Sequence, residues 1–211
     1  MGRARWVVAA AVLLAAAPAV QAARFTMSVS PVTAAELHWS YRSGCPVPPP
    51  DLRLLRLTYW GFDGLSHEGA IVVNRAVVAA VGRVFATLYA GRFPIRRMEP
   101  IDAFQGNDYR SMAADNTSGF NCRSAVTTGP RQWSAHAYGE AIDVNPLENP
   151  YELAGGVYPP AGRAYLDRAD VRPGMAFEGG QLVAAFASVG WEWGGRWAGS
   201  PDYQHFSSTG G

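Results

Sequence analysis

The feature that most constrains this chain is the stretch SAHAYGEAIDVNP at residues 134–146. It sets His136 seven positions before Asp143, with Gly139 between them. A glycine allows the backbone to turn tightly, and the residues after it alternate, with apolar side chains on one face and Asp143 on the other. The pattern therefore predicts a turn followed by a strand, with the carboxylate of the strand close to the imidazole before the turn.

This histidine and aspartate are good zinc ligands, but two ligands do not make a site. A catalytic zinc ion commonly takes three protein ligands and leaves a fourth position for water. Among the other histidines, His205 in DYQHF is the strongest third ligand, whereas His38 and His67 are interpreted as structural or exposed. Taken alone, the spacing of His136 and Asp143 is equally compatible with a hydrogen bond that orients a histidine.

A metal-dependent hydrolase also needs a base. Zinc lowers the pKa of a bound water to about 7, and a carboxylate within hydrogen-bond reach can then accept the proton. Asp202 lies three residues before His205, a spacing that puts a carboxylate beside the metal without coordinating it. We therefore predict that Asp202 is the base, with Glu192 in WEW as the second candidate.

Hydrophobic residues make up 48% of the 211 positions, which is enough for a core. Alternation and turn residues predict strands over 52–64 and 66–74, joined as a hairpin. Asn74 is a good N-cap for a helix of about sixteen residues that ends near Gly91. A shorter helix is expected over 181–189, and the last two strands in WEWGGRW and DYQHFSS. Three segments show no regular period or read as loops: 24–41, 104–132 and most of 149–175.

The N-terminus predicts export. Residues 1–22 combine an arginine-bearing head, a short apolar run and small residues before a cut after Ala22, which is typical of a cleaved signal peptide; the alternative is an uncleaved membrane anchor. No later segment is apolar enough to span a membrane, so no stable membrane insertion is expected after cleavage. In an oxidising compartment Cys45 and Cys122 are expected to form a disulfide, with two buried thiols as the alternative.

The remaining organisation is simple. No internal repeat or clear boundary is present, so we divide the mature chain into an extended lead-in, 23–56, tied by the disulfide, and one catalytic domain, 57–211. The formal net charge is +1 and no basic run occurs, which argues against a nucleic-acid partner. We expect a monomer.

The full string S-x-H-x-x-G-x-A-x-D, followed by D-x-x-H-F, resembles a family of zinc peptidases. These are the D-alanyl-D-alanine carboxypeptidases and L-alanyl-D-glutamate endopeptidases, which act on bacterial cell-wall peptides. The resemblance runs from about Leu57 to Phe206. It implies an α+β fold of the hedgehog and DD-peptidase type, with a small antiparallel sheet and flanking helices around a single zinc ion. The implied ligands are His136, Asp143 and His205.

The resemblance also implies the remaining site residues. Asp202 matches the family's catalytic carboxylate, which is Glu in the carboxypeptidase branches, so an Asp is more similar to the endopeptidase branch. The family uses an arginine to bind or polarise the substrate, and Arg123 is the first choice for it. Arg110 and Arg97 are the alternatives. Ser134 is carried over as a substrate contact or as a support for the metal ligands.

These features together predict a secreted zinc metallopeptidase, periplasmic or associated with the cell wall, that hydrolyses peptidoglycan stem peptides. The sequence leaves open whether it removes a terminal D-alanine or cuts inside the stem. A non-catalytic wall-binding module with the same fold is the alternative. A serine or cysteine hydrolase is disfavoured, because no G-x-S-x-G string is present and Cys122 is expected to be oxidised.

Overall fold

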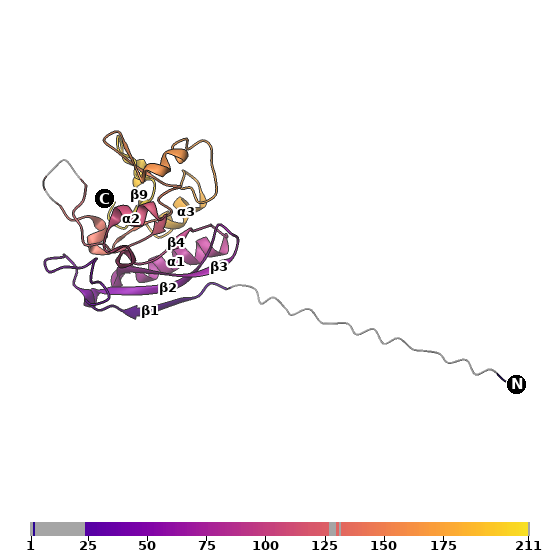
Figure 1. Cartoon of the computed structure of the whole chain (residues 1–211), viewed down its shortest axis with the longest axis horizontal. Helices are drawn as coiled ribbons and strands as arrows, with labels where there is room; N and C mark the ends of the chain where they lie inside the picture. Colours follow the sequence, from indigo (N-terminus) through magenta and orange to yellow (C-terminus); the bar gives the residue numbers. More distant parts are fainter. Residues whose placement is uncertain (1, 3–23, 127–129, 131, 211) are drawn as a thin grey trace.

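The computed structural model describes residues 2, 24–126, 130 and 132–210. The predicted signal peptide, 1–22, therefore lies outside the described residues except for Gly2, and its cleavage stays a prediction. Among the described helices, none has the length and apolar character needed to cross a membrane. The fold mixes helices with small, mostly antiparallel sheets, as Figure 1 shows. This agrees with the predicted combination of small antiparallel sheets and flanking helices.

The first sheet has the strand order β1-β2-β3, and both pairings are antiparallel. Its strands are β1 (Met27–Pro31), β2 (Leu52–Trp60) and β3 (Ser66–Asn74). The predicted hairpin is confirmed as β2 and β3, which are paired from Leu52 opposite Asn74 to Trp60 opposite Ser66. Strand β1 was not expected, although Met27 and Val29 alternate with Ser28 and Ser30, and all of its residues are exposed. The predicted boundary between residues 56 and 57 falls inside β2, and this division stays a prediction.

The main helix follows the first sheet directly. Asn74 accepts a hydrogen bond from the backbone N–H of Ala76 at 3.0 Å and so begins a 3-10 turn (Arg75–Val77) that leads into α1 (Val78–Ala90). One face of α1 is buried against β2 and α3 (Gln181–Ala187), and Gly91 ends the helix. The predicted cap, helix and stop are therefore confirmed.

A second antiparallel sheet, with the strand order β6-β10-β9, carries the motif residues. Its strands are β6 (Ala141–Asp143), β9 (Glu192–Trp193) and β10 (His205–Ser207), and α3 (Gln181–Ala187) packs beside it. One hydrophobic core joins both sheets, because buried side chains of β2, β3 and α1 contact those of β6, α3 and β10. The short strands of this sheet are therefore held by a core that the longer elements build.

Short elements occupy the segments that the sequence left as loops or extended chain. They are β4 (Arg97–Met98), α2 (Asp108–Ala113), β5 (Asn116–Thr117), the hairpin β7 (Tyr151–Leu153) and β8 (Gly156–Tyr158), and 3-10 turns at Pro49–Asp51, Ile101–Phe104, Ala135–Tyr138, Pro160–Tyr165 and Gly194–Arg196. Strand β4 pairs in parallel with β5.

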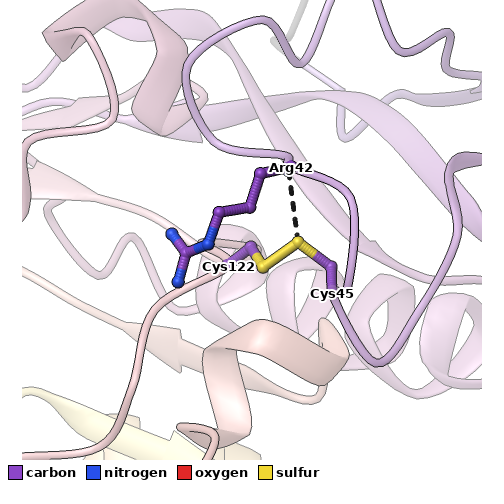
Figure 2. Close-up of a disulfide and its surroundings, with 3 residues drawn as sticks. All are labelled: Arg42, Cys45 and Cys122. Carbon is purple, nitrogen blue, oxygen red and sulfur yellow. Dashed lines mark hydrogen bonds between the residues drawn. A yellow bond between two sulfur atoms is a disulfide. The ribbon is translucent and has the colours of Figure 1, made fainter.

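Cys45 and Cys122 form the predicted disulfide, which Figure 2 shows together with Arg42. The backbone N–H of Arg42 donates to the Cys45 sulfur at 3.2 Å. Cys122 is buried in a second apolar cluster that also contains Leu52 and Phe120. The disulfide therefore ties the proline-rich lead-in to the segment that runs into the His136 motif.

Asparagine side chains fix the chain after β6. Asn145 has a left-handed backbone (φ 46°), which asparagine tolerates better than most residues. Its amide donates to the carbonyls of Pro94 and Gly174 and accepts from the N–H of Arg96. Asn149 similarly donates to the carbonyl of Val144 at 3.0 Å. The Asn145-Pro146 step of the motif therefore anchors the end of β6 to the body of the protein.

A buried carboxyl pair lies just beyond this anchor. Asp115 and Glu148 are each 2% exposed and share a hydrogen bond, and the Arg96 guanidinium lies 3.6 Å from Asp115 and 3.9 Å from Glu148. Burial, together with the negative charge of Asp115, raises the pKa of Glu148 from 4.5 to about 8. Burial in this pair therefore favours the protonated form of the Glu148 carboxyl.

We predict that breaking the disulfide destabilises the fold. The bond closes a loop with a sequence separation of 77 residues, and the chain-entropy model assigns about 4 kcal/mol to such a closure. Urea denaturation of the Cys45→Ser/Cys122→Ser variant should give a free energy of unfolding lower by this amount. Equal free energies of unfolding for the wild type and the variant would contradict the prediction.

We predict that Glu148 makes stability depend on pH. Because its pKa is raised to about 8 on folding, the unfolded chain loses this proton at a lower pH than the folded chain. The free energy of unfolding should therefore fall as pH rises from about 4.5 to about 8 and should level off above that. Urea denaturation across this window should show a weaker fall for Glu148→Gln, and an unchanged slope would exclude Glu148 as the source.

Candidate metal centre

The register of β6 and β10 brings two of the predicted ligands together. The antiparallel pairing sets His205 directly opposite Asp143 and Phe206 opposite Ile142. Directly opposed residues point to the same face of a sheet, with Cβ atoms about 5 Å apart. Ile142 and Phe206 face the core and are fully buried, so the alternation turns the histidine and the aspartate to the other face.

The third ligand comes from the turn before β6. His136 lies in the 3-10 turn Ala135–Tyr138, where the Ser134 hydroxyl accepts from its N–H at 3.3 Å. Gly139 ends this turn with a left-handed φ of 68°, and a Cβ there would lie 2.6 Å from the backbone nitrogen of Asn74. Only glycine fits at this point. The turn predicted between the histidine and the strand is therefore present.

The three side chains form one buried cluster. His136, Asp143 and His205 are 2%, 5% and 5% exposed. Nε2 of His136, Oδ1 of Asp143 and Nδ1 of His205 are each 3.2 Å from the other two. Ligands at about 2.0 Å around a tetrahedral ion are separated by about 3.3 Å. The triangle of donor atoms therefore has the size that a tetrahedral metal ion requires.

The hydrogen bonds around His136 support the same conclusion. Its Nδ1 donates to the carbonyl of Gly119 at 2.8 Å, so a neutral ring presents a bare Nε2 to the cluster. A ligating histidine commonly donates its other nitrogen to such a carbonyl. With both imidazoles neutral and in the matching tautomers, Nε2 of His136, Nδ1 of His205 and Oδ1 of Asp143 would present lone pairs to one cation. The residues present fit a divalent metal ion.

The electrostatics of Asp143 suit a ligand that must stay ionised. Burial alone would raise its pKa, but the charges and hydrogen bonds of His136 and His205 outweigh burial and lower the pKa well below its usual value. Its backbone is fixed as well, because Asp143 and Ser118 exchange backbone hydrogen bonds at 2.9 and 3.0 Å. The carboxylate is thus an anion at any physiological pH.

Asp202 lies in the same cavity as the cluster. Its N–H donates to the carbonyl of Gly194 at 3.0 Å, and its Oδ1 is buried without a hydrogen-bond partner. Burial, with the negative charge of Asp143, raises its pKa to about 7 against the opposing charges of His205 and Arg123. A Cβ on Gly194 would lie 2.8 Å from the Asp202 carbonyl oxygen, so the WGGRW segment packs closely behind this residue.

The cavity above the cluster has a volume of about 520 Å³, within the range of ligand-binding pockets. Helix α2, the segments on either side of residues 127–131, the β7-β8 hairpin and Trp197 form its walls. The Trp197 ring packs on His205 with ring centroids 5.1 Å apart. The sequence singled out neither this tryptophan nor Tyr151 and Tyr158, because an isolated aromatic residue in a loop gives no sign of where it points.

Of the three predicted arginines, one lines the cavity and two lie outside its lining. Arg123 lines the cavity, where its Nε lies 3.1 Å from the Asp108 carboxylate. Arg110 is exposed and donates to Gln105 at 2.7 Å, and Arg97 is ion-paired with Glu99 at 3.6 Å. Arg123 is the only arginine among the described residues of the lining.

The other candidate site residues also divide into those inside and those outside the cavity. Ser134 lines the cavity and caps the turn that carries His136. Glu192 is exposed on β9 and lies outside the lining. His67 is ion-paired with Asp63 at 2.9 Å on the surface, and His38 is exposed, as interpreted from the sequence. Asp202 rather than Glu192 is therefore the carboxylate that shares the cavity with the cluster.

Comparison with known proteins supports the resemblance over part of the chain. Residues 127–208 match the family model described as D-alanyl-D-alanine carboxypeptidase. This segment contains the three cluster residues and Asp202, and it is shorter than the predicted extent from Leu57 to Phe206. No curated protein and no solved structure matches the chain.

We predict that the cluster binds one Zn²⁺ per chain. Isothermal titration of the metal-free protein with zinc should show this stoichiometry, and His205→Ala should weaken binding by more than about a hundredfold, because the loss of a ligand exceeds the effect of losing its supporting contacts. His67→Ala is the matched control and should bind as the wild type does. Equal zinc affinity in His205→Ala and the wild type would contradict the assignment.

Proposed function

We propose that this protein is a secreted zinc metallopeptidase that hydrolyses peptide bonds of peptidoglycan stem peptides. The observation that carries the proposal is the cluster of His136, Asp143 and His205, with donor atoms 3.2 Å apart at the base of a cavity that also holds Asp202. The family match over residues 127–208 supports the chemistry and the substrate class. The disulfide supports a location outside the cytoplasm, in the periplasm or at the cell wall.

The chemistry follows from the groups that surround the cavity. His136, Asp143 and His205 would hold the ion. A zinc ion there supplies Lewis acidity that polarises a carbonyl oxygen and makes water more acidic. The Gly119 carbonyl accepts the Nδ1 proton of His136, so in the neutral ring Nε2 is the nitrogen that would coordinate the ion.

Asp202 moves the proton in the proposed reaction. Asp202 lines the cavity and its Oδ1 has no protein hydrogen-bond partner, so this carboxyl group is the proposed proton acceptor. The carboxylate accepts a proton as the water oxygen attacks the peptide carbonyl carbon. It then gives this proton to the departing amine nitrogen as the C–N bond breaks. Burial raises the pKa of Asp202 to about 7 in the metal-free protein, and a cation bound beside it would lower this pKa and favour the ionised form that accepts the proton.

Arg123 and Ser134 complete the proposed site. Arg123 presents N–H donors to the cavity and can hold a carbonyl oxygen of the peptide. Ser134 positions His136 through the cap of its turn. The aromatic side chains of Tyr151, Tyr158 and Trp197 provide apolar walls against which a peptide can pack.

The proposal predicts zinc-dependent hydrolysis that requires Asp202. Purified stem peptides incubated with zinc-loaded protein should give fragments that mass spectrometry identifies, and a chelator should abolish cleavage until zinc is restored. Asp202→Asn should bind zinc as the wild type does but lose at least about a hundredfold in kcat, because general acid–base catalysis typically contributes that much.

Glu192→Gln is the matched control for this test. Glu192 was the second candidate for the base, but it is exposed and outside the cavity, so its loss should leave turnover unchanged. Wild-type turnover in Asp202→Asn, or loss of activity in Glu192→Gln alone, would show that the base has been misassigned.

A further inference from the structure

The cavity contains a fixed ion pair beside the reaction site. Nε of Arg123 lies 3.1 Å from Oδ2 of Asp108, and the other oxygen of Asp108 accepts from the side-chain amide of Asn121 at 3.3 Å. Both Asp108 and Arg123 line the cavity, and their side chains are 28% and 26% exposed. Asp108 therefore cannot turn away from Arg123 without losing both contacts.

This pair changes what Arg123 can recognise. An unpaired arginine binds a carboxylate strongly, through charge and two parallel hydrogen bonds. Here the charge of Arg123 is already balanced by Asp108, and its remaining donors suit a neutral carbonyl oxygen. A substrate carboxylate at Arg123 would also lie near the negative charge of Asp108, and like charges that are brought together in a partly buried site repel strongly.

The other charged residues of the cavity also disfavour a substrate carboxylate. Asp143 and Asp202 add carboxyl groups to the described lining, whereas Arg123 is the one arginine in that part of it. The volume of about 520 Å³ is that of a site for a ligand larger than a single small amino acid. The described walls thus favour a longer stretch of peptide over a chain end whose free carboxylate would lie at Arg123 and Asp108.

We propose that Asp108 is a specificity-determining residue that prevents Arg123 from anchoring a free C-terminal carboxylate. The preferred substrate is then a peptide with more than one residue after the scissile bond. This inference rests on the proposed function. It selects cleavage inside the stem peptide rather than removal of the terminal residue. Asp108 is a positioning residue in this proposal, because it affects substrate choice only by balancing the charge of Arg123.

The test compares two stem peptides that differ only at the C-terminus, one a free acid and the other its primary amide. For the zinc-loaded wild type, kcat/KM should be at least as high for the amide as for the acid, and mass spectrometry should find an internal cut. In Asp108→Asn the acid-to-amide ratio of kcat/KM should rise by about tenfold, since the removed charge lies next to a partly buried arginine.

Three further variants separate specificity from general damage. Asp108→Glu keeps the charge and should keep the wild-type ratio, whereas Asp108→Asn/Arg123→Gln should reverse the rise. Asp170→Asn removes an exposed aspartate from a surface ion pair with Arg172 and should change nothing. Binding of the same peptides to the metal-free Asp202→Asn protein, measured by calorimetry, gives a second readout without turnover, in which adding Asp108→Asn should strengthen binding of the free acid.

The outcomes distinguish this inference from the proposed function. A wild-type preference of tenfold or more for the free acid would overturn the inference alone. The inference would also be overturned if the acid-to-amide ratio of kcat/KM in Asp108→Asn stayed within twofold of the wild-type ratio. Absence of zinc-dependent hydrolysis of both peptides would overturn the proposed function and this inference with it.

Discussion

The pairing of β6 with β10 is the interaction on which the site depends. It sets His205 opposite Asp143 although the two residues are 62 positions apart in the chain. The apolar residues that alternate with them, Ile142 and Phe206, are fully buried in the core. A slip of one residue would exchange the two faces of either strand. Hydrophobic burial therefore fixes the register, and the register fixes the ligands.

A cluster of this kind is costly without a cation. Two imidazole nitrogens and a carboxylate oxygen, all buried and 3.2 Å apart, bring lone pairs against one another unless a proton or a cation lies between them. The Gly119 carbonyl makes the arrangement specific, because it holds the proton of His136 on the nitrogen that faces away from the cluster. The protein tolerates these buried polar groups because the surrounding core holds both sheets together. Such a site is preorganised for a metal ion and leaves the adjacent cavity for a substrate.

Much of the fold and of the cluster could be predicted from short sequence patterns. The hairpin of β2 and β3, the cap at Asn74 and the turn at Gly139 each depend on residues close together in the sequence, and the motif strings identified the three cluster residues. The short elements were not predicted. The alternation in β1 is brief and leads to no buried face, and α2 and the β7-β8 hairpin are too short to show a period. The choice among the arginines also needed the structure. Asp108 contacts Arg123 because it lies at the start of α2. The sequence of the polar segment 104–132 gives no sign of that contact.

The most direct test of the account is a crystal structure of the zinc-loaded protein with anomalous diffraction measured at the zinc absorption edge. The account predicts one strong anomalous peak in the cavity, about 2.0–2.2 Å from Nε2 of His136, Oδ1 of Asp143 and Nδ1 of His205, with Asp202 beside the ion but not bonded to it. A peak bound elsewhere, a peak on the opposite nitrogen of either histidine, or no peak at this cluster would contradict the central claim that these three residues form the metal centre.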